Sequence, residues 1–264
     1  MFKDIKQVMK DSVLYGIGNV AVKLVGFILI PLYTDAEYFS TADYGLMGLL
    51  EVTSQILIAV MGLSLYSGLI RWYWDAEYRD KQKTIFFTTL LFTILTSLCI
   101  GSVLWLNVGE LSALLVQQEG YSLGGELPYI LQLLILTSML GAVVEVPQNL
   151  LRLQRKPIYY SLTNIVRLFV TLVITIYFTI SLHRGVSGVY EAQLVGIAIQ
   201  LLMVLPLVIK NSSCRVDRKC TIQLLAYSYP LVFLAIVGSL LTVFDRYIIC
   251  LLYTSPSPRD STSS

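Results

Sequence analysis

Long runs of apolar residues, separated by short polar segments, dominate the chain. Seven such runs can be counted, and each is long enough to cross a bilayer as a helix. They span residues 13–33, 46–70, 84–106, 129–151, 160–181, 190–209 and 224–250. Membrane β-strands are only about ten residues long and alternate strictly, which these runs do not. The pattern therefore predicts an all-α fold, a polytopic bundle of membrane helices.

Composition supports the membrane assignment and narrows the chemistry. The chain is 56% hydrophobic and 14% charged, whereas soluble domains carry about 25% charged residues. The loops are too short for a soluble domain. No P-loop, HExxH or GxSxG motif occurs, so we expect no enzyme and no cofactor. Cys214 and Cys220 do not have the spacing of a zinc site, and we interpret them as thiols in a reducing loop.

Lysine and arginine alternate sharply between the two sides of the predicted membrane. Fourteen lie in the N-terminal tail and the second, fourth and sixth loops, against only Arg184 in the other loops. Cytoplasmic loops carry the excess of basic residues, so the N-terminus is predicted to be cytoplasmic. The basic start precedes an apolar run longer than a signal peptide's, and we expect an uncleaved first helix.

The last residues differ from all that precedes them. The stretch from 250 to 264 is rich in serine and proline, and CLLYTSPSPRDS resembles a peptide translated from unremoved sequencing adapter. We therefore interpret 250–264 as a non-native, adapter-like tail and exclude it from fold reasoning. The native protein is expected to continue beyond about Ile249.

Several charged residues fall inside the predicted spans, where they are candidates for function. Lys23 lies near the middle of the first run, and Arg167 lies at a similar depth in the fifth. Glu51 lies toward the outer end of the second run and Glu145 toward the inner end of the fourth. The pair Asp245 and Arg246 lies near the outer end of the seventh.

Polar residues recur at helical spacing beside these charges, so that several helices carry one polar stripe. Stripes at full membrane depth must face one another or water, which predicts a hydrated central cavity. The stripes comprise Gly16, Asn19, Lys23 and Gly26; Glu51, Ser54 and Gln55; Thr137, Gly141, Glu145, Gln148 and Arg152; and Tyr160, Thr163, Asn164, Arg167 and Thr171.

Two interpretations of the charges remain open. Lys23 and Arg167 could pair with Glu51 and Glu145 as structural ion pairs. Alternatively, the two cations line the cavity and bind an anionic substrate, with arginine supplying a planar fork suited to phosphate oxygens. The similar depth of the two cations, with the acids nearer opposite faces, favours the second interpretation.

Several segments resemble a known family of transporters. They are LYGIGNVAVKLVGFILIPLYT, STADYG, RWYWD, VPQNLLRLQRKPIYY, GVSGVYEAQLVG and SYPLVF followed by DRYII. Over about residues 5–249 the chain resembles the Wzx-type polysaccharide-export flippases of the multidrug/oligosaccharidyl-lipid/polysaccharide exporter superfamily.

The resemblance implies two six-helix lobes around a central cavity that opens alternately to each side. Residues 1–209 would be the N-terminal lobe, 210–222 a cytoplasmic linker and 223–249 the first helix of a truncated C-terminal lobe. The family flips undecaprenyl-diphosphate-linked oligosaccharide across the bacterial inner membrane for cell-surface polysaccharide synthesis. By position, Lys23 and Arg167, with Asn19 and Asn164 beside them, would bind the diphosphate. The missing second lobe puts the activity of this chain alone in doubt.

The resemblance also implies partners: the lipid-linked oligosaccharide, membrane lipids, a polysaccharide polymerase and a chain-length regulator, but no nucleic acid. Two other functions remain open. A cation-coupled multidrug exporter of the same superfamily would require Glu51 or Glu145 to be essential and Lys23 dispensable. A polytopic polysaccharide polymerase or glycosyltransferase is disfavoured, because no large outer loop or cytosolic catalytic domain is present.

Overall fold

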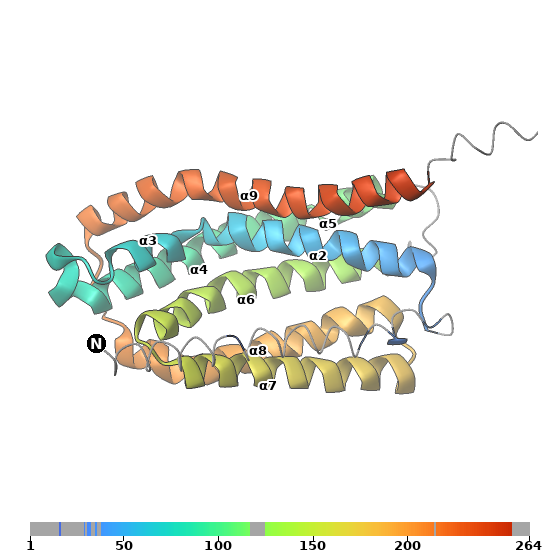
Figure 1. Cartoon of the computed structure of the whole chain (residues 1–264), viewed down its shortest axis with the longest axis horizontal. Helices are drawn as coiled ribbons and strands as arrows, with labels where there is room; N and C mark the ends of the chain where they lie inside the picture. Colours follow the sequence, from blue (N-terminus) through green and yellow to red (C-terminus); the bar gives the residue numbers. More distant parts are fainter. Residues whose placement is uncertain are drawn as a thin grey trace, which may run out of the picture.

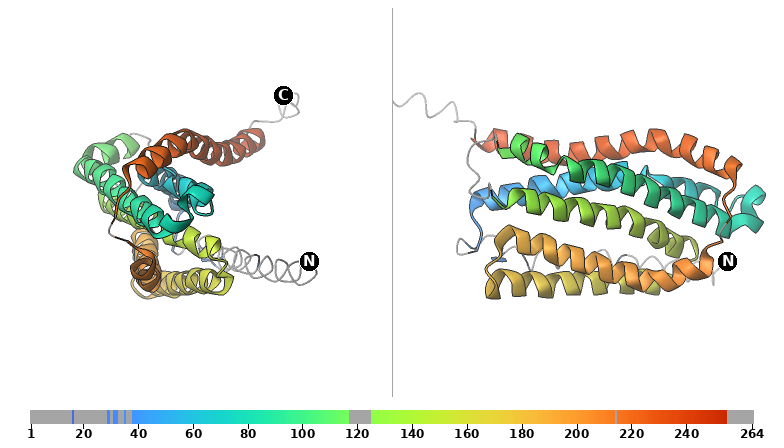
Figure 2. Two further views of the ribbon diagram at one scale, coloured as in Figure 1. Left: turned by 90° about the vertical axis from the view of Figure 1, so that its left-hand side faces the viewer. Right: turned by 180° about the vertical axis from the view of Figure 1, so that it is seen from behind.

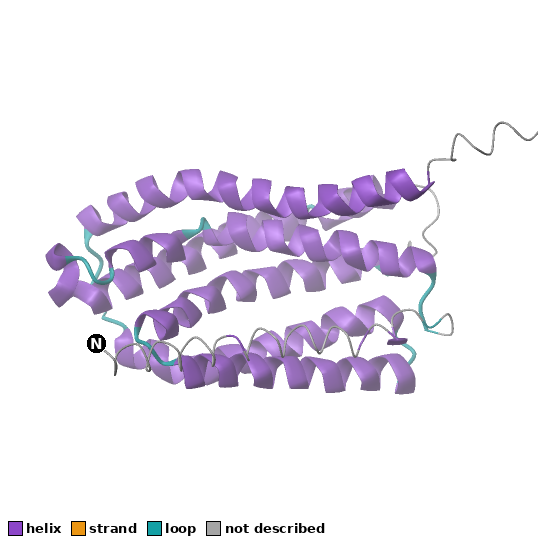
Figure 3. Cartoon of the chain, viewed as in Figure 1, coloured by secondary structure: helices purple, strands orange, loops and turns teal. Residues whose placement is uncertain are grey.

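A computed structural model describes residues 38–116, 125–213 and 215–254, together with positions 16, 29, 31, 32 and 35. All regular structure in these ranges is helical (Figure 3). The elements are α2 (Thr41–Gly62), α3 (Leu65–Trp72), the 3₁₀ helix η1 (Ala76–Lys81), α4 (Gln82–Leu106), α5 (Val108–Val116), α6 (Leu127–Leu153), α7 (Pro157–Ile176), the π-helical turn η2 (Tyr177–Ser181), α8 (Gly185–Asn211) and α9 (Arg218–Thr254).

The long helices run side by side along one axis, as both side views show (Figures 1 and 2). Within the described ranges, six helices are long and apolar enough to cross a membrane. They correspond to the second through seventh predicted runs, so the predicted polytopic helix bundle is confirmed. Of the first run, 13–33, only four isolated positions are described, and Asn19 and Lys23 lie outside the described residues.

A capping box starts α2. The hydroxyl of Ser40 accepts a hydrogen bond of 3.2 Å from the Asp43 backbone N–H, and the Asp43 carboxylate accepts one of 2.9 Å from the Ser40 N–H. The two side chains satisfy backbone donors that a helix start leaves without partners. This exchange explains why α2 begins at Thr41, directly after Ser40 in the segment STADYG.

The second predicted run is not one helix. It breaks between α2 and α3 at Leu63 and Ser64, whose φ angles are 45° and 49°. Both residues adopt the left-handed conformation, which ends the regular i to i−4 hydrogen bonding, and the Leu63 N–H bonds instead to the Val60 carbonyl. The prediction of a continuous 46–70 helix was therefore wrong, because neither residue is one that normally marks such a break.

Two further segments differ from the predicted pattern. The predicted loop after residue 106 contains the short helix α5, whose Val108 is buried against α6. The irregular stretch between α8 and α9 is shorter than the predicted 210–222 linker, because α8 extends to Asn211 and α9 begins at Arg218. Helix α9 also continues past the predicted end at 249 to Thr254.

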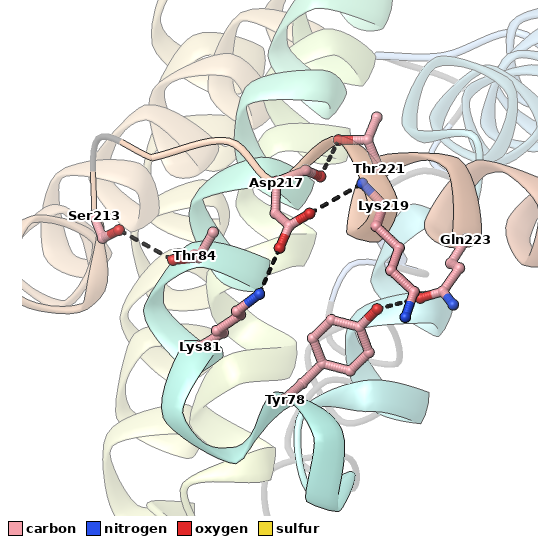
Figure 4. A network of polar contacts seen from close by, with 8 residues as sticks. All are labelled: Tyr78, Lys81, Thr84, Ser213, Asp217, Lys219, Thr221 and Gln223. Atoms are coloured by element: carbon pink, nitrogen blue, oxygen red, sulfur yellow. Dashed lines mark hydrogen bonds and ion pairs between the residues drawn. The ribbon is translucent and has the colours of Figure 1, made fainter.

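Hydrogen bonds hold this connection against the start of α4 (Figure 4). Lys81 and Asp217 form an ion pair of 2.8 Å, and the Asp217 carboxylate also accepts a hydrogen bond of 3.0 Å from the Lys219 backbone N–H. The hydrogen bond from Lys81 is the main reason that the pKa of Asp217 lies below its usual value. Thr84 and Ser213, 3.3 Å apart, add a second link.

Two apolar cores stabilise the bundle, one toward each end. The outer core joins α2, α5, α6 and α8. The inner core, at the end predicted to be cytoplasmic, joins α3, α4, α6, the last turns of α8 and the first two turns of α7 and α9. Completely buried members include Met61 and Ile130 in the outer core and Leu69, Ile85, Phe86 and Leu150 in the inner core.

Helix α7 has two contrasting faces. Its predicted polar stripe points into the bundle, where Tyr160 and Thr163 are buried. Its opposite face carries exposed apolar side chains at helical spacing, as expected for a helix that meets lipid. These are Ile158, Leu162, Ile165, Phe169 and Val173. The sequence periodicity alone therefore orients α7.

Candidate functional site

A cavity of about 290 Å³ lies between α2, α6, α7 and α8. Its lining is unusually polar for the interior of a membrane bundle. The lining residues are Ser54, Ile58, Thr137, Gly141, Val144, Glu145, Gln148, Asn149, Arg152, Tyr160, Asn164, Arg167, Gln193, Ile197 and Gln200. We call this space the central cavity, since it matches the polar interior expected from the sequence.

Helix α6 supplies one wall. All five residues of its predicted polar stripe line the cavity: Thr137, Gly141, Glu145, Gln148 and Arg152. They recur at steps of three and four residues and therefore share one face of the helix. The stripe continues without a break past Pro147, which lies within α6.

A chain of hydrogen bonds joins α7 and α8 on the opposite wall. Arg167 donates a hydrogen bond of 3.1 Å to Oε1 of Gln200, and Nε2 of Gln200 donates one of 3.1 Å to Oδ1 of Asn164. Asn164 in turn donates to the Tyr160 carbonyl at 2.8 Å. Gln200 is 1% exposed, so this amide fixes Arg167 and Asn164 inside the protein.

Two contacts join α6 to α7 nearer the inner end. Nε2 of Gln148 donates a hydrogen bond of 2.9 Å to the Thr163 hydroxyl. The Arg152 guanidinium donates to the Tyr160 hydroxyl and lies 4.6 Å from the centre of the Tyr160 ring. Arg152 thus combines a hydrogen bond with a cation–π contact and closes the inner side of the cavity wall.

Three side chains that line the cavity have hydrogen-bonding groups that no other described residue satisfies. The Glu145 carboxylate has no hydrogen-bond or ion-pair partner there, and Oε1 of Gln148 is buried without one. Arg167 uses one of its five donors, on Gln200. The acceptors lie on α6 and the strongest donor on α7. Unmatched polar groups in a buried space are costly unless a ligand or water completes them.

The structure does not pair Arg167 with an acid in the described part of the chain. Its partner is the neutral amide of Gln200 rather than Glu51 or Glu145. Glu51 is exposed and does not line the cavity, where α2 instead contributes Ser54 and Ile58. The structural pairing of Arg167 with a carboxylate, considered from the sequence, is therefore not found among these residues.

The remaining predicted site residues are not all described. Asn164 and Arg167 lie together on the cavity wall, as their spacing predicted. The side chains of Asp245 and Arg246 on α9 lie outside the described part, as do Lys23 and Asn19. Their proposed roles stay predictions.

The sequence reasoning missed Gln193, Gln200 and Asn149 as cavity residues. The first two belong to α8, for which no polar stripe was proposed. A usable pattern was present, because Gln193, Ile197 and Gln200 follow the i, i+4, i+7 spacing of one helix face. Asn149 lies directly after Gln148, at the edge of the stripe on α6.

No family model and no curated protein matches the chain. Several solved structures match the chain in fold. A mutant of the Vibrio cholerae MATE transporter VcmN is 16% identical, with a TM-score of 0.70 over 96% of this chain and 57% of its own. The chain has the fold of a MATE transporter over about half of that transporter's length.

Two other solved structures give the same result. A MATE protein in the straight conformation is 17% identical, with a TM-score of 0.68 over 89% of this chain and 53% of its own. A MOP-superfamily transporter from Pyrococcus furiosus is 18% identical, with a TM-score of 0.68 over 89% of this chain and 52% of the transporter. The chain is thus a multi-pass helical membrane protein, and its fold is similar to that of these transporters.

Proposed function

We propose that the chain is part of an alternating-access transporter whose solute site is the central cavity. The observation that carries this proposal is the position of Glu145, Gln148 and Arg167 around one cavity inside an otherwise apolar helix bundle. Charged groups at such depth are costly and are typical of substrate or ion pathways. The MATE fold supports the proposal, because the similar structures are transporters rather than enzymes.

The function best supported is export of cationic amphiphiles, coupled to cation entry. Glu145 is the one acid among the described residues that line the cavity, and its carboxylate has no hydrogen-bond partner there, so it can hold a drug cation or the coupling ion. One similar structure is a multidrug-resistance MATE transporter of the MOP superfamily, which favours this substrate class.

Drug efflux from cells that express the protein tests this function. Glu145→Gln preserves the shape of the side chain and removes its charge, so we expect efflux to fall at least tenfold. Glu51→Gln is the matched control, because Glu51 is exposed and lies outside the cavity. Normal efflux by Glu145→Gln at equal protein level would exclude Glu145 as the coupling group.

A second candidate is flipping of undecaprenyl-diphosphate-linked oligosaccharide across the bacterial inner membrane. Arg167 favours it, because within the part of the chain that the structure describes only the bond to Gln200 uses one of its five donors, which leaves four for phosphate oxygens. The Pyrococcus furiosus transporter, described as having a binding pocket of reversed polarity, supports the idea that this fold accepts different charges.

Polysaccharide export separates the two candidates. In a flippase, Arg167→Gln and Lys23→Ala should each abolish export, whereas Glu145→Gln should leave most of it. Arg79→Gln serves as a control, because it removes an exposed cation from the 3₁₀ helix η1, outside the cavity. Full export by both Arg167→Gln and Lys23→Ala, at normal protein levels, would rule out the diphosphate role.

A further inference from the structure

A second hollow, of about 620 Å³, lies at the inner end of the bundle where α6 ends and α7 begins. It is lined by Trp74, Leu153, Gln154, Arg155 and Lys156. None of these residues lines the central cavity, so the two sites are separate. We call this second space the inner hollow.

The inner hollow lies at the level where membrane meets water. The span of α6 ends at Leu153 and that of α7 begins at Pro157, so the hollow sits between two membrane crossings. The Trp74 side chain is 64% exposed beside it. Tryptophan is enriched at the depth of lipid headgroups, where its ring meets both acyl chains and water.

The charges in the inner hollow are of one sign. Its lining contains two cations, Arg155 and Lys156, and no acid. Arg155 is exposed, and its guanidinium has no hydrogen-bond or ion-pair partner among the described residues. Lys156 donates one hydrogen bond of 2.7 Å, to Oε1 of Gln154, and keeps two donors. Both cations can therefore bind an anion without giving up an existing ion pair.

The floor of the inner hollow is held in place by hydrogen bonds. Nε2 of Gln154 donates to Oδ1 of Asn211 at 2.9 Å and to the Tyr73 hydroxyl at 3.3 Å. Gln154 thus ties the end of α6 to the end of α8 and to the residue that follows α3. A basic loop that merely faces the cytoplasm does not need such a fixed floor, whereas a binding site does.

We propose that the inner hollow binds the phosphate of an anionic phospholipid from the cytoplasmic leaflet. Arg155 presents a planar fork to two phosphate oxygens, and Lys156 adds a point charge. Trp74 and Leu153 contact the glycerol and the first acyl carbons. Charge complementarity and the depth of the hollow select a lipid headgroup, because clusters of basic residues at the cytoplasmic surface attract anionic lipids.

Lipid retention by the purified chain in detergent tests the proposal. Native mass spectrometry would compare bound phosphatidylglycerol with bound phosphatidylcholine for each variant. The double substitution Arg155→Gln/Lys156→Gln should weaken phosphatidylglycerol retention by about tenfold or more, since two cations are lost. The control Arg79→Gln/Lys83→Gln removes the same charge from exposed residues outside the hollow and should change retention less than about twofold.

Further variants keep the test decisive if the double substitution unfolds the protein. Arg155→Lys keeps the charge but loses the fork, and Trp74→Leu removes the exposed ring. Each substitution should partly weaken the retention of phosphatidylglycerol. The unfolding temperature measured with phosphatidylcholine as the only lipid should stay unchanged. Equal losses in the control pair would show a general charge effect and overturn the site. Retention by the double variant at the wild-type level would also overturn it.

Inorganic phosphate distinguishes the two possible sources of the anion. Inorganic phosphate at roughly millimolar concentration should not displace phosphatidylglycerol, because inorganic phosphate lacks the contacts made by glycerol and the acyl chains. Displacement that depends on Arg155 would identify free phosphate as the ligand and reject the lipid. These outcomes are independent of transport, so the site can fail while the proposed function stands.

Discussion

Arg167 on α7 donates a hydrogen bond of 3.1 Å to the amide oxygen of Gln200 on α8. The amide nitrogen of the same Gln200 donates to Asn164, so one buried side chain positions two polar residues of α7 that line the cavity. Within the described ranges no acid pairs with Arg167, so its positive charge is free there to meet an anionic group in the cavity.

Gln200→Leu should destabilise the protein. The substitution keeps the approximate size but leaves Arg167 and Asn164 without their shared partner, at a cost of about 1–3 kcal/mol in the free energy of unfolding. Thermal unfolding in detergent measures it. The control Leu202→Ala lies two residues along α8 and is 66% exposed, so it should have a smaller effect. Equal stability of Gln200→Leu and wild type would show that the hydrogen bonds contribute nothing.

Gly196→Ala should loosen the pairing of α7 and α8. A Cβ at position 196 would lie 2.1 Å from the Thr171 hydroxyl oxygen and 3.2 Å from the Arg167 carbonyl oxygen, which forces the helices apart. Such overpacking typically costs about 1–3 kcal/mol. Gly45→Ala is the matched control, because nothing lies within 4 Å of a Cβ there. The readout is again thermal unfolding.

A second substitution should partly rescue Gly196→Ala. Thr171→Ala removes the hydroxyl that causes the closest contact, so the double variant should recover a part of the loss, with a coupling energy of about 0.5–3 kcal/mol. The contact with the Arg167 backbone remains and limits the recovery. If the loss of stability in the double variant equalled the sum of the losses in the two single variants, the clash would not involve the Thr171 hydroxyl.

The stabilising effect of the Lys81–Asp217 pair should depend on pH. The hydrogen bond from Lys81 lowers the pKa of Asp217, so the folded protein releases this proton more readily than the unfolded chain. The stabilisation is complete above the ordinary aspartate pKa of about 3.9 and is lost as the pH falls through the lower folded value.

Asp217→Asn should therefore lower Tm at pH 7 and match the wild type in strong acid. The effect at pH 7 is expected to be small and to shrink with added salt, since the pair is exposed. Asp80→Asn is the matched control, because it removes an equal charge from an exposed residue of the adjoining 3₁₀ helix η1. A Tm difference that stays constant from neutral to acid pH would contradict a role for the Asp217 charge.

Ser64→Gly should leave the protein equally stable or stabilise it by up to about 1 kcal/mol, because glycine adopts the left-handed conformation without steric cost. Ser64→Val should destabilise it by more than about 1 kcal/mol, because a β-branched side chain fits that conformation poorly. Comparing the two unfolding curves isolates the backbone effect at φ 49°. If the valine variant were as stable as the glycine variant, the break at α2–α3 would not be strained.

Much of the fold followed from local patterns. Hydrophobic length predicted the six described spans, since a membrane helix must satisfy its backbone hydrogen bonds within itself. Helical periodicity predicted the polar cavity face of α6 apart from Asn149, and the polar face of α7 that carries Asn164 and Arg167. These features depend on residues close together in the chain, so the sequence by itself determined them.

Which faces meet was decided only in the tertiary structure. The partner of Arg167 proved to be Gln200 rather than Glu145 or Glu51, and the cavity takes Ser54 from α2 while Glu51 stays exposed. The rotation and depth of packed helices select these partners, and they depend on close contacts such as Gly196 against Thr171. Such contacts join residues distant in sequence, and no local pattern encodes them.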